Sequence, residues 1–190
     1  MKKVVIVGVG ALGSHVAQLL RNEADLRLVD FDRLEQKNIL AQFHARAHVG
    51  RNKAESAKKT LDFLFSTKVE AIPHKLVDDN ALQLLQGTEL IIDCLDNGAS
   101  RRIVQAHART FKVPCLHGAL APAASFGRVV WDEGFVVDDE SADGEATCEG
   151  GEHLPFIAIV SAFVARSSQM FLEDGTKVGW QVHPGGATRI

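Results

Sequence analysis

A glycine-rich loop near the start of the sequence most constrains what this chain can fold into. The loop runs from Gly8 to Gly13 with the sequence GVGALG, directly after the apolar residues 4–7. Because glycine has no Cβ, Gly8 and Gly10 let a phosphate group approach the backbone, and Gly13 lets the following helix pack closely on its strand. The N-terminus of that helix then faces the anion. The loop therefore predicts a nucleotide site.

The residues after the loop predict a helix and a second strand. Apolar side chains recur at helical spacing from Leu12 to Leu20, and residues 26–29 form a short apolar segment. Asp30 follows this segment, and its carboxylate can reach a ribose hydroxyl there. The loop and Asp30 alone are also compatible with an NAD-dependent oxidoreductase.

Strand-like segments alternate with helical patterns through the first part of the chain. Apolar segments at 4–7, 26–29, 69–72, 90–93 and 115–118 predict strands. The residues after Gly50 and residues 97–111 predict helices. This alternation is typical of a parallel sheet with helices on both faces.

The pattern changes after residue 126. Residues 127–131 and 135–137, separated by Asp-Glu-Gly, predict an antiparallel hairpin. Residues 155–172 predict a helix that is apolar nearly all round and ends at Gly175, and residues 178–182 predict a last strand before a polar tail. Together these patterns predict an α/β fold with a Rossmann-like, doubly wound mixed sheet, parallel in its N-terminal half and antiparallel in its C-terminal strands.

Length and composition favour a single domain over residues 1–190. A chain of 190 residues with 46% hydrophobic residues can bury one core but is too short for a separate substrate domain. No leader pattern begins the chain, and Arg166 and Gln169 interrupt the longest apolar stretch, so we expect a cytoplasmic protein without a membrane span. The scattered basic residues predict no nucleic-acid binding. The three cysteines form no CxxC pair, which predicts no structural zinc.

One segment carries a concentrated negative charge. Residues 138–152 contain seven acidic residues and no Lys or Arg, whereas the formal net charge of the whole chain is −3. Such a segment cannot bury enough apolar surface to order itself alone. We therefore predict a flexible acidic loop.

Four further motifs follow the glycine loop in order. They are D-x-D at Asp30, N-x-x-x-Q beginning at Asn38, G-x-x-K ending at Lys53, and D-N-x-x-x-R beginning at Asp96. This series resembles the adenylyltransferases of the ThiF/MoeB/HesA family, which are similar to ubiquitin-activating enzymes. The resemblance reaches to about Gly175.

The resemblance implies an activity, cofactors and a partner. ATP and Mg²⁺ would activate the C-terminal carboxylate of a ubiquitin-like or sulfur-carrier protein ending in Gly-Gly, forming an acyl-adenylate and releasing pyrophosphate, in a homodimer built around the second half of the sheet. Lys53 would neutralise the charge that develops on the phosphates, and Asp96 would bind Mg²⁺. Asn38 and Gln42 would donate hydrogen bonds to the phosphates, while Asp30 would bind the ribose.

The predicted site residues fall into two groups, those that bind the nucleotide and those that act in catalysis. The expected nucleotide-binding residues are Gly8, Gly10, Ala11, Leu12, Gly13, Asp30, Asp32, Asn38, Gln42, Lys53, Asp96 and Asn97. The expected catalytic residues are Lys53, Asp96, Asn38 and Cys148. Cys148 lies where some family members keep a thiol that captures the activated carrier, although the flanking Glu145 and Glu149 disfavour its thiolate.

Other readings of these residues stay open. Lys53 is also compatible with a solvated helix lysine, the Asp96-Asn97 pair with a helix cap, and Arg101 with a structural contact. The histidines lack metal-ligand spacing and indicate surface or packing positions.

The chain also departs from the family pattern. Ala41 stands where the family carries a phosphate-contacting arginine. Arg46, Arg51 or a partner subunit would have to supply that cation. In the family a partner often does so from a segment before its first strand, and here only three residues precede that strand. A catalytically degenerate partner subunit is therefore the alternative function. The carboxylate substrate stays open among sulfur carriers, ubiquitin-like modifiers, peptides and a tRNA.

Overall fold

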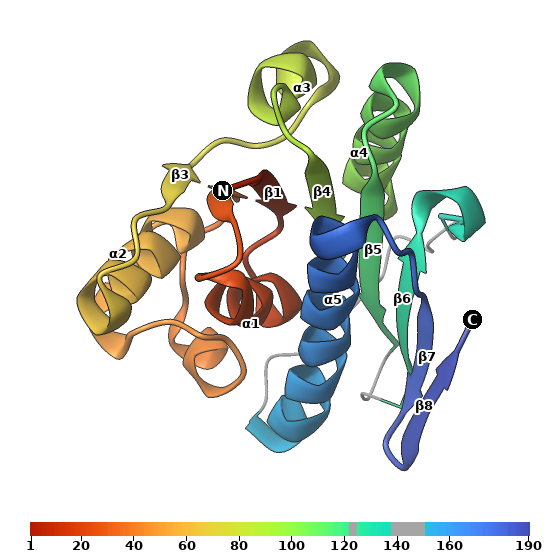
Figure 1. Ribbon diagram of the computed structural model, residues 1–190. Helices are drawn as coiled ribbons and strands as arrows, with labels where there is room; N and C mark the ends of the chain where they lie inside the picture. The colour runs from red at the N-terminus through yellow and green to blue at the C-terminus, as the bar shows by residue number, and fades with distance from the viewer. Residues whose placement is uncertain (122–124, 138–150) are drawn as a thin grey trace.

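The fold is a mixed sheet covered by helices on both faces (Figure 1). The computed structural model describes residues 1–121, 125–137 and 151–190. In these residues one sheet of eight strands has the order β3-β2-β1-β4-β5-β6-β7-β8. The strands are β1 (Lys3–Val7), β2 (Asp25–Val29), β3 (Glu70–Ile72), β4 (Leu90–Asp93), β5 (Cys115–Leu120), β6 (Gly127–Trp131), β7 (Trp180–His183) and β8 (Gly186–Arg189).

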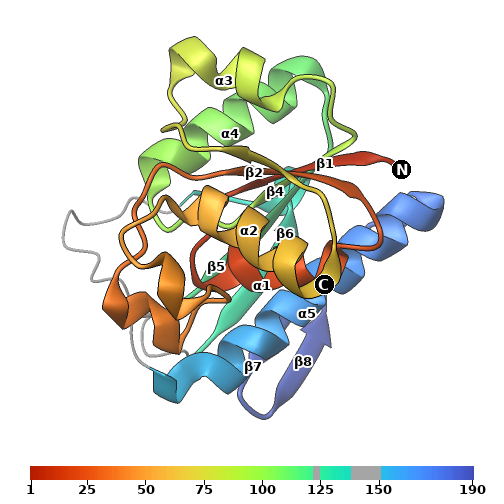
Figure 2. The same ribbon diagram turned by 90° about the vertical axis from the view of Figure 1, so that its left-hand side faces the viewer.

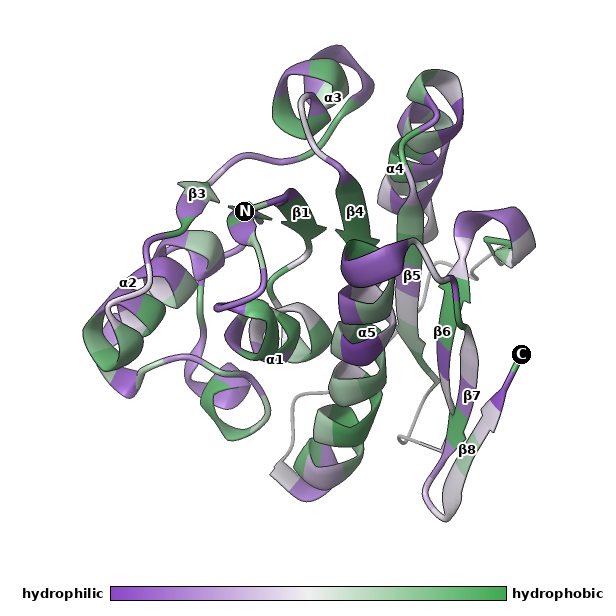
Figure 3. Ribbon diagram, in the orientation of Figure 1, coloured by the Kyte–Doolittle hydropathy of each residue, from purple (hydrophilic) through white to green (hydrophobic). Residues whose placement is uncertain are grey.

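The direction of the strands changes in the middle of the sheet. The strands from β3 to β5 pair in parallel, and β5 to β8 pair antiparallel. This confirms the predicted doubly wound mixed sheet. Figure 3 shows that β1 and β4 are mostly hydrophobic, as expected for strands buried on both faces.

Two hydrophobic clusters lie on the two faces of the sheet. Val4 and Ile6 face the cluster that contains α1 (Ala11–Leu20), α2 (Lys53–Phe65) and α5 (Leu154–Asp174). Val5 and Val7 face the cluster that contains α3 (Asp78–Leu85) and α4 (Gly98–Phe111). Figure 2 shows α3 and α4 above the first strands and the other three helices below them.

The predicted hairpin of residues 127–131 and 135–137 is wrong. Asp132–Gly134 form the short 3₁₀ helix η4, and Phe135 turns inward to stack on His117, with ring centroids 4.0 Å apart. Both edges of β6 are occupied by β5 and β7. The predicted polar tail is also corrected, because Gly186–Arg189 form β8 and pair with β7.

The apolar C-terminal helix is confirmed as α5, and it ends at Gly175, which has a left-handed φ of 83°. The segment Gly151–Asp174 is long and apolar enough to cross a membrane by length and composition alone, which corrects the expectation from Arg166 and Gln169. Val160 and Val164 are fully buried, in the same hydrophobic cluster as α1 and β5. The helix therefore forms part of the domain core.

Candidate nucleotide site

The glycine loop connects β1 to α1, and its three glycines serve different purposes. Gly8 has a φ of +86°, and a Cβ there would lie 2.8 Å from the carbonyl oxygen of Cys94. A Cβ on Gly13 would lie 1.8 Å from the carbonyl oxygen of Gly8. At Gly10 the nearest atom to such a Cβ is Nε2 of Gln42 at 3.9 Å. Gly8 and Gly13 thus permit close packing within the protein, while Gly10 leaves open space above the loop.

The N-terminus of α1 provides hydrogen-bond donors at this open space. Gly10 is the N-cap residue, and no side chain in the described parts of the chain caps the helix. The N–H groups of Ala11, Leu12 and Gly13 precede the first intrahelical bond, which runs from Ser14 N–H to the Gly10 carbonyl. Uncapped N–H groups and the positive end of the helix dipole together favour an anion.

The D-x-D motif forms a tight turn after β2. The Asp30 carboxylate accepts hydrogen bonds from the N–H groups of Val9 and Asp32, at 2.7 and 2.8 Å. Burial raises the pKa of Asp30 to about 6, although Lys53 and the two backbone bonds oppose the shift. Asp30 therefore joins the glycine loop to the turn, and a ribose hydroxyl would have to share its carboxylate oxygens with these N–H groups.

Lys53 begins α2 and lies directly beside this turn. Its Nζ is 3.1 Å from Oδ2 of Asp32, and its backbone N–H bonds to the Asp32 carbonyl. The Lys53 side chain is only 13% exposed, so it is not a solvated helix lysine. This ion pair places one cation close to the predicted ribose and phosphate positions.

Asn52 organises the same corner and was missed in the sequence. Its amide donates to the carbonyls of Asp30 and Asp32, at 2.8 and 3.2 Å, and its oxygen accepts from the N–H of Glu55. An Asn followed three residues later by Glu is an N-cap signal for a helix. That signal could have identified the start of α2 but not its contacts with the turn.

The segment from Asn38 to His44 closes the site on the side of α1. Asn38 stabilises this segment, since its side-chain oxygen accepts the N–H of Glu35 and its carbonyl oxygen accepts the N–H of Gln42. Its role towards phosphate stays a prediction. The amide of Gln42 lies beside Gly10, and its Oε1 is buried without a partner among the described residues. A buried polar atom without a partner is rare, and here it lies next to the open space at the loop.

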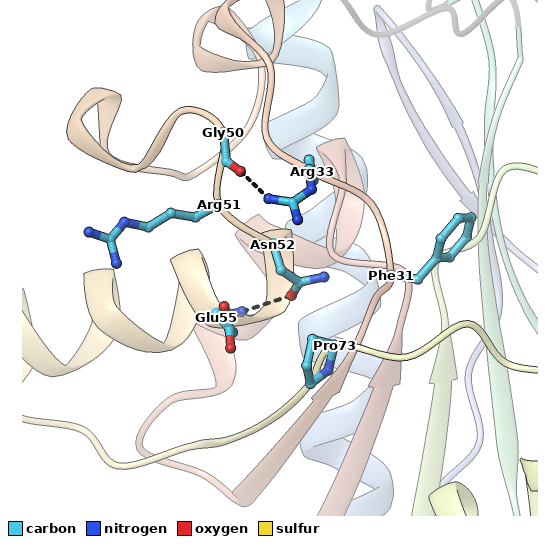
Figure 4. A pocket seen from close by; sticks show the side chains of 7 residues that line it. All are labelled: Phe31, Arg33, Gly50, Arg51, Asn52, Glu55 and Pro73. Carbon is cyan, nitrogen blue, oxygen red and sulfur yellow. Dashed lines mark hydrogen bonds between the residues drawn. The ribbon is translucent and has the colours of Figure 1, made fainter.

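Ala41 is fully buried in the core. His15 lies with Nε2 3.1 Å from the Ala41 carbonyl oxygen, and Ser14 accepts the N–H of Phe43. Arg46 is exposed, and Arg51 extends away from Arg33 and Asn52 (Figure 4). Neither guanidinium contacts Ala41 in the described residues.

The D-N-x-x-x-R motif lies across the switch point, after β4. Asn97 caps α4 by accepting the N–H of Ser100 at 2.9 Å, and Asp96 beside it is exposed. In the described residues, no group of three or more His, Cys, Asp or Glu could hold a metal ion.

Arg101 makes structural contacts, as the sequence indicated. It donates to Asp93 at 2.9 Å and to the carbonyls of Leu95 and Gly118. Burial alone would raise the pKa of Asp93, but Arg101 and a hydrogen bond from His117 outweigh it and hold the pKa below its usual range. This buried pair fixes the turn that carries Asp96.

A small cavity of roughly 340 Å³ opens beside the D-x-D turn. Pro73 lies near Asn52 and Arg33, and Phe31 lies at the far edge with its ring directed away from them (Figure 4). The cavity is next to the turn of Asp30 and Asp32, so it extends the site away from the glycine loop.

The structure thus brings most of the predicted site together at the carboxyl ends of β1, β2 and β4. The chain reverses its direction across the sheet between β1 and β4, which is where ligands bind in open α/β sheets. Cys148 and most of the predicted acidic loop lie outside the described residues.

Comparison with known proteins agrees with this arrangement. A sequence model of the ThiF family matches residues 1–168. The chain is 36% identical over 124 residues to a molybdopterin-synthase adenylyltransferase of Salmonella typhimurium, covering 62% of this chain and 49% of that protein. It is also 36% identical over 121 residues to a sulfur carrier protein adenylyltransferase of Thermus thermophilus, covering 62% and 45%. The chain spans about half the length of these relatives, or less for others.

Solved structures show the same fold. The microcin C7 biosynthetic enzyme MccB, in complex with N-formylated MccA, superposes over 100% of this chain and 63% of its own with a TM-score of 0.80 at 18% identity. MccB of E. coli with ATP gives a TM-score of 0.76 at 16% identity, covering 100% of this chain and 62% of its own.

Proposed function

Because the chain belongs to the ThiF family, we propose that it is an adenylyltransferase that uses ATP to activate a C-terminal carboxylate. The observation that carries this proposal is the corner formed by the uncapped N-terminus of α1, the Lys53–Asp32 ion pair and the Asp96 turn. This corner offers fixed N–H donors, one cation and one exposed carboxylate around an open space. These are the groups that a nucleoside triphosphate needs.

The proposed reaction brings together two negatively charged groups, the substrate carboxylate and the triphosphate of ATP. A carboxylate oxygen attacks the α-phosphorus of ATP, the bond to the β-phosphate oxygen breaks, and pyrophosphate leaves. Two anions must meet, so the protein has to position them and neutralise the charge that moves to the leaving group. Lys53 and the α1 N-terminus would do this, and Asp96 would hold Mg²⁺, which would supply further positive charge to the phosphates.

The other end of the nucleotide would lie towards the cavity beside the D-x-D turn. Phe31 offers an aromatic ring and Pro73 an apolar surface, both suited to the face of a purine. Asp32 is half-exposed and close enough to reach a ribose hydroxyl. Asp30, with both carboxylate oxygens bound to backbone N–H groups, would lie at the floor of the ribose site and share these oxygens with a ribose hydroxyl.

The substrate would be the C-terminal carboxylate of a small protein or peptide. Relatives are named for molybdopterin synthase and a sulfur carrier protein, and one MccB structure contains N-formylated MccA. We infer that a ubiquitin-like or sulfur-carrier protein ending in Gly-Gly is the partner of this chain. A cytoplasmic homodimer built around the second half of the sheet belongs to the same proposal.

Pyrophosphate exchange tests the proposal. The protein should exchange labelled pyrophosphate into ATP only when a carrier ending in Gly-Gly is present. Lys53→Ala and Asp96→Ala should lose the exchange, whereas Lys58→Ala should keep it, because Lys58 is an exposed lysine on the same helix. Unchanged exchange in both site variants would reject this site.

A second candidate function is a catalytically degenerate partner subunit. The observation that favours it is the burial of Ala41, which leaves the nucleotide site without the family arginine. Such a subunit would bind Mg-ATP but make no pyrophosphate alone, and activity would appear on mixing with an active homologue. Activity of the purified chain with a carrier alone would exclude this candidate.

A further inference from the structure

His44 contacts the glycine loop from the segment that follows the D-x-D turn. The Nε2 of His44 lies 3.0 Å from the carbonyl oxygen of Val9, and the backbone N–H of Val9 donates to the Asp30 carboxylate at 2.7 Å. Val9 is fully buried, and His44 is 9% exposed. The backbone of Val9 is therefore held on both sides, by a carboxylate and by an imidazole.

The direction of the next N–H group follows from this contact. In a planar trans peptide the C=O of Val9 and the N–H of Gly10 point in opposite directions. Because the Val9 carbonyl points to His44, the Gly10 N–H points away from it. Within the described residues no group accepts a hydrogen bond from Gly10 N–H, and a Cβ on Gly10 would meet open space apart from Gln42.

The protonation of His44 follows from its partners. A carbonyl oxygen only accepts hydrogen bonds, so Nε2 carries the proton. Burial lowers the pKa of His44 to about 4, and Lys53 lowers it further while the Val9 bond opposes the shift, so the ring is neutral near pH 7. The remaining Nδ1 is a bare acceptor that is buried without a partner among the described residues. A bare lone pair repels phosphate oxygens, so His44 does not itself bind the phosphates.

We propose that His44 is a positioning residue of the nucleotide site, which holds the Val9–Gly10 peptide so that the Gly10 N–H donates to a phosphate oxygen. The inference rests on the proposed ATP site. It adds a residue that acts through the backbone and never touches the nucleotide.

Two substitutions separate this role from general packing. His44→Gln places an amide N–H near the position of Nε2 and should keep the bond to Val9, whereas His44→Asn is too short to reach it. His107→Gln is the control, because His107 is a buried histidine on α4, on the opposite face of the sheet. Binding of Mg-ATP would be measured by calorimetry, and the Gly10 amide resonance by ¹⁵N NMR with and without nucleotide.

We expect His44→Asn to bind Mg-ATP about tenfold more weakly, the effect of one lost hydrogen bond, and His44→Gln to stay within about twofold of the wild type. The Gly10 amide resonance of the free protein should move in His44→Asn and stay in place in His44→Gln. Equal binding by wild type and His44→Asn would overturn the inference and leave the proposed function standing. If His44→Asn fails to fold, tenfold weaker binding by His44→Gln than by His107→Gln overturns it. A wild type that binds no Mg-ATP would refute the proposed function and the inference with it.

Discussion

A single methyl group placed on Gly13 or on Gly10 should have opposite consequences for stability and for nucleotide binding. On Gly13 the new Cβ would lie 1.8 Å from the Gly8 carbonyl oxygen, where anything under 3.0 Å forces a shift. The Cβ is fixed by the backbone of α1 and the carbonyl oxygen by the backbone of the glycine loop, so neither atom can rotate away. At Gly10 the nearest atom is Nε2 of Gln42, the end of a side chain, at 3.9 Å.

The expected magnitudes follow from these distances. Gly13→Ala gains roughly 1 kcal/mol of helix propensity, but α1 must move by more than 1 Å, and the loss should exceed about 4 kcal/mol, at the extreme of single substitutions. Gly10→Ala should change the free energy of unfolding by less than about 1 kcal/mol. Its methyl group would occupy the space above the loop and weaken Mg-ATP binding at least tenfold, since phosphate could no longer approach the backbone.

Urea denaturation and calorimetric titration with Mg-ATP measure the two effects separately. Gly87→Ala is not a suitable control because its φ is +68°, whereas Gly185→Ala meets nothing within 4 Å and lies far along the chain at the β7–β8 turn. Gly185→Ala should therefore retain both stability and binding. A stable Gly13→Ala protein would refute the packing argument, and full Mg-ATP affinity in Gly10→Ala would show that no phosphate approaches this glycine.

Three further outcomes are expected. Burial, and to a lesser extent Lys53, His15 and His48, lower the pKa of His44 from near 6.5 to about 4 in the folded protein. As pH falls through this window the unfolded state takes up the proton first, so His44→Gln should gain about 2 kcal/mol of stability relative to wild type between pH 7 and pH 5. Asp93→Asn should lower the free energy of unfolding in urea by about 3–5 kcal/mol at pH 7, since Arg101 stays buried without its partner charge. The difference between wild type and variant should fade below about pH 4, because a carboxylate with a lowered pKa stabilises the fold only while it is ionised. Ala41→Arg should lower the urea midpoint by burying a guanidinium in the core, and unchanged stability would contradict this.

The parallel half of the sheet could be predicted because its signal is local. Val4, Ile6, Ile91 and Ile92 are fully buried, and a strand buried on both faces is a continuous apolar run in any sequence. The turn signals around it, such as Gly175 after α5, are local as well. The parallel, doubly wound arrangement followed from the alternation of strands and helices.

The misplaced elements depend on tertiary contacts that a local pattern does not contain. Every residue of β8 is exposed, so Gly186–Arg189 have no alternation of buried and exposed positions to reveal a strand. Phe135 looked like a strand residue because it is apolar, but its ring is needed to cover His117. The eight-residue helix α3 has three buried residues and was not predicted either.

The same distinction applies to the candidate site. Lys53 and Asp96 were predicted because they belong to spaced motifs, and the structure places them on either side of the loop. His44 was set aside among the histidines without ligand spacing. Its importance depends on the carbonyl of Val9, 35 residues away in sequence. No sequence spacing signals a contact between a side chain and a distant backbone group.

Binding of a nucleotide and catalysis of its transfer need different groups, and this chain has the groups for binding but lacks one expected for catalysis. Binding needs positioned donors, which the uncapped α1 N-terminus and Gly10 provide without any charge. Catalysis also needs a cation at the charge that develops in the transition state. Ala41 removes one such cation, and the contacts of His15 and Ser14 with the surrounding segment leave this position in the core. Lys53 is then the cation on which adenylation by this chain alone would depend, and it is already paired with Asp32 at 3.1 Å. A second cation would have to come from an exposed arginine such as Arg46 or Arg51, or from a partner subunit. The choice between an active enzyme and a degenerate subunit rests on whether one of these reaches the phosphates.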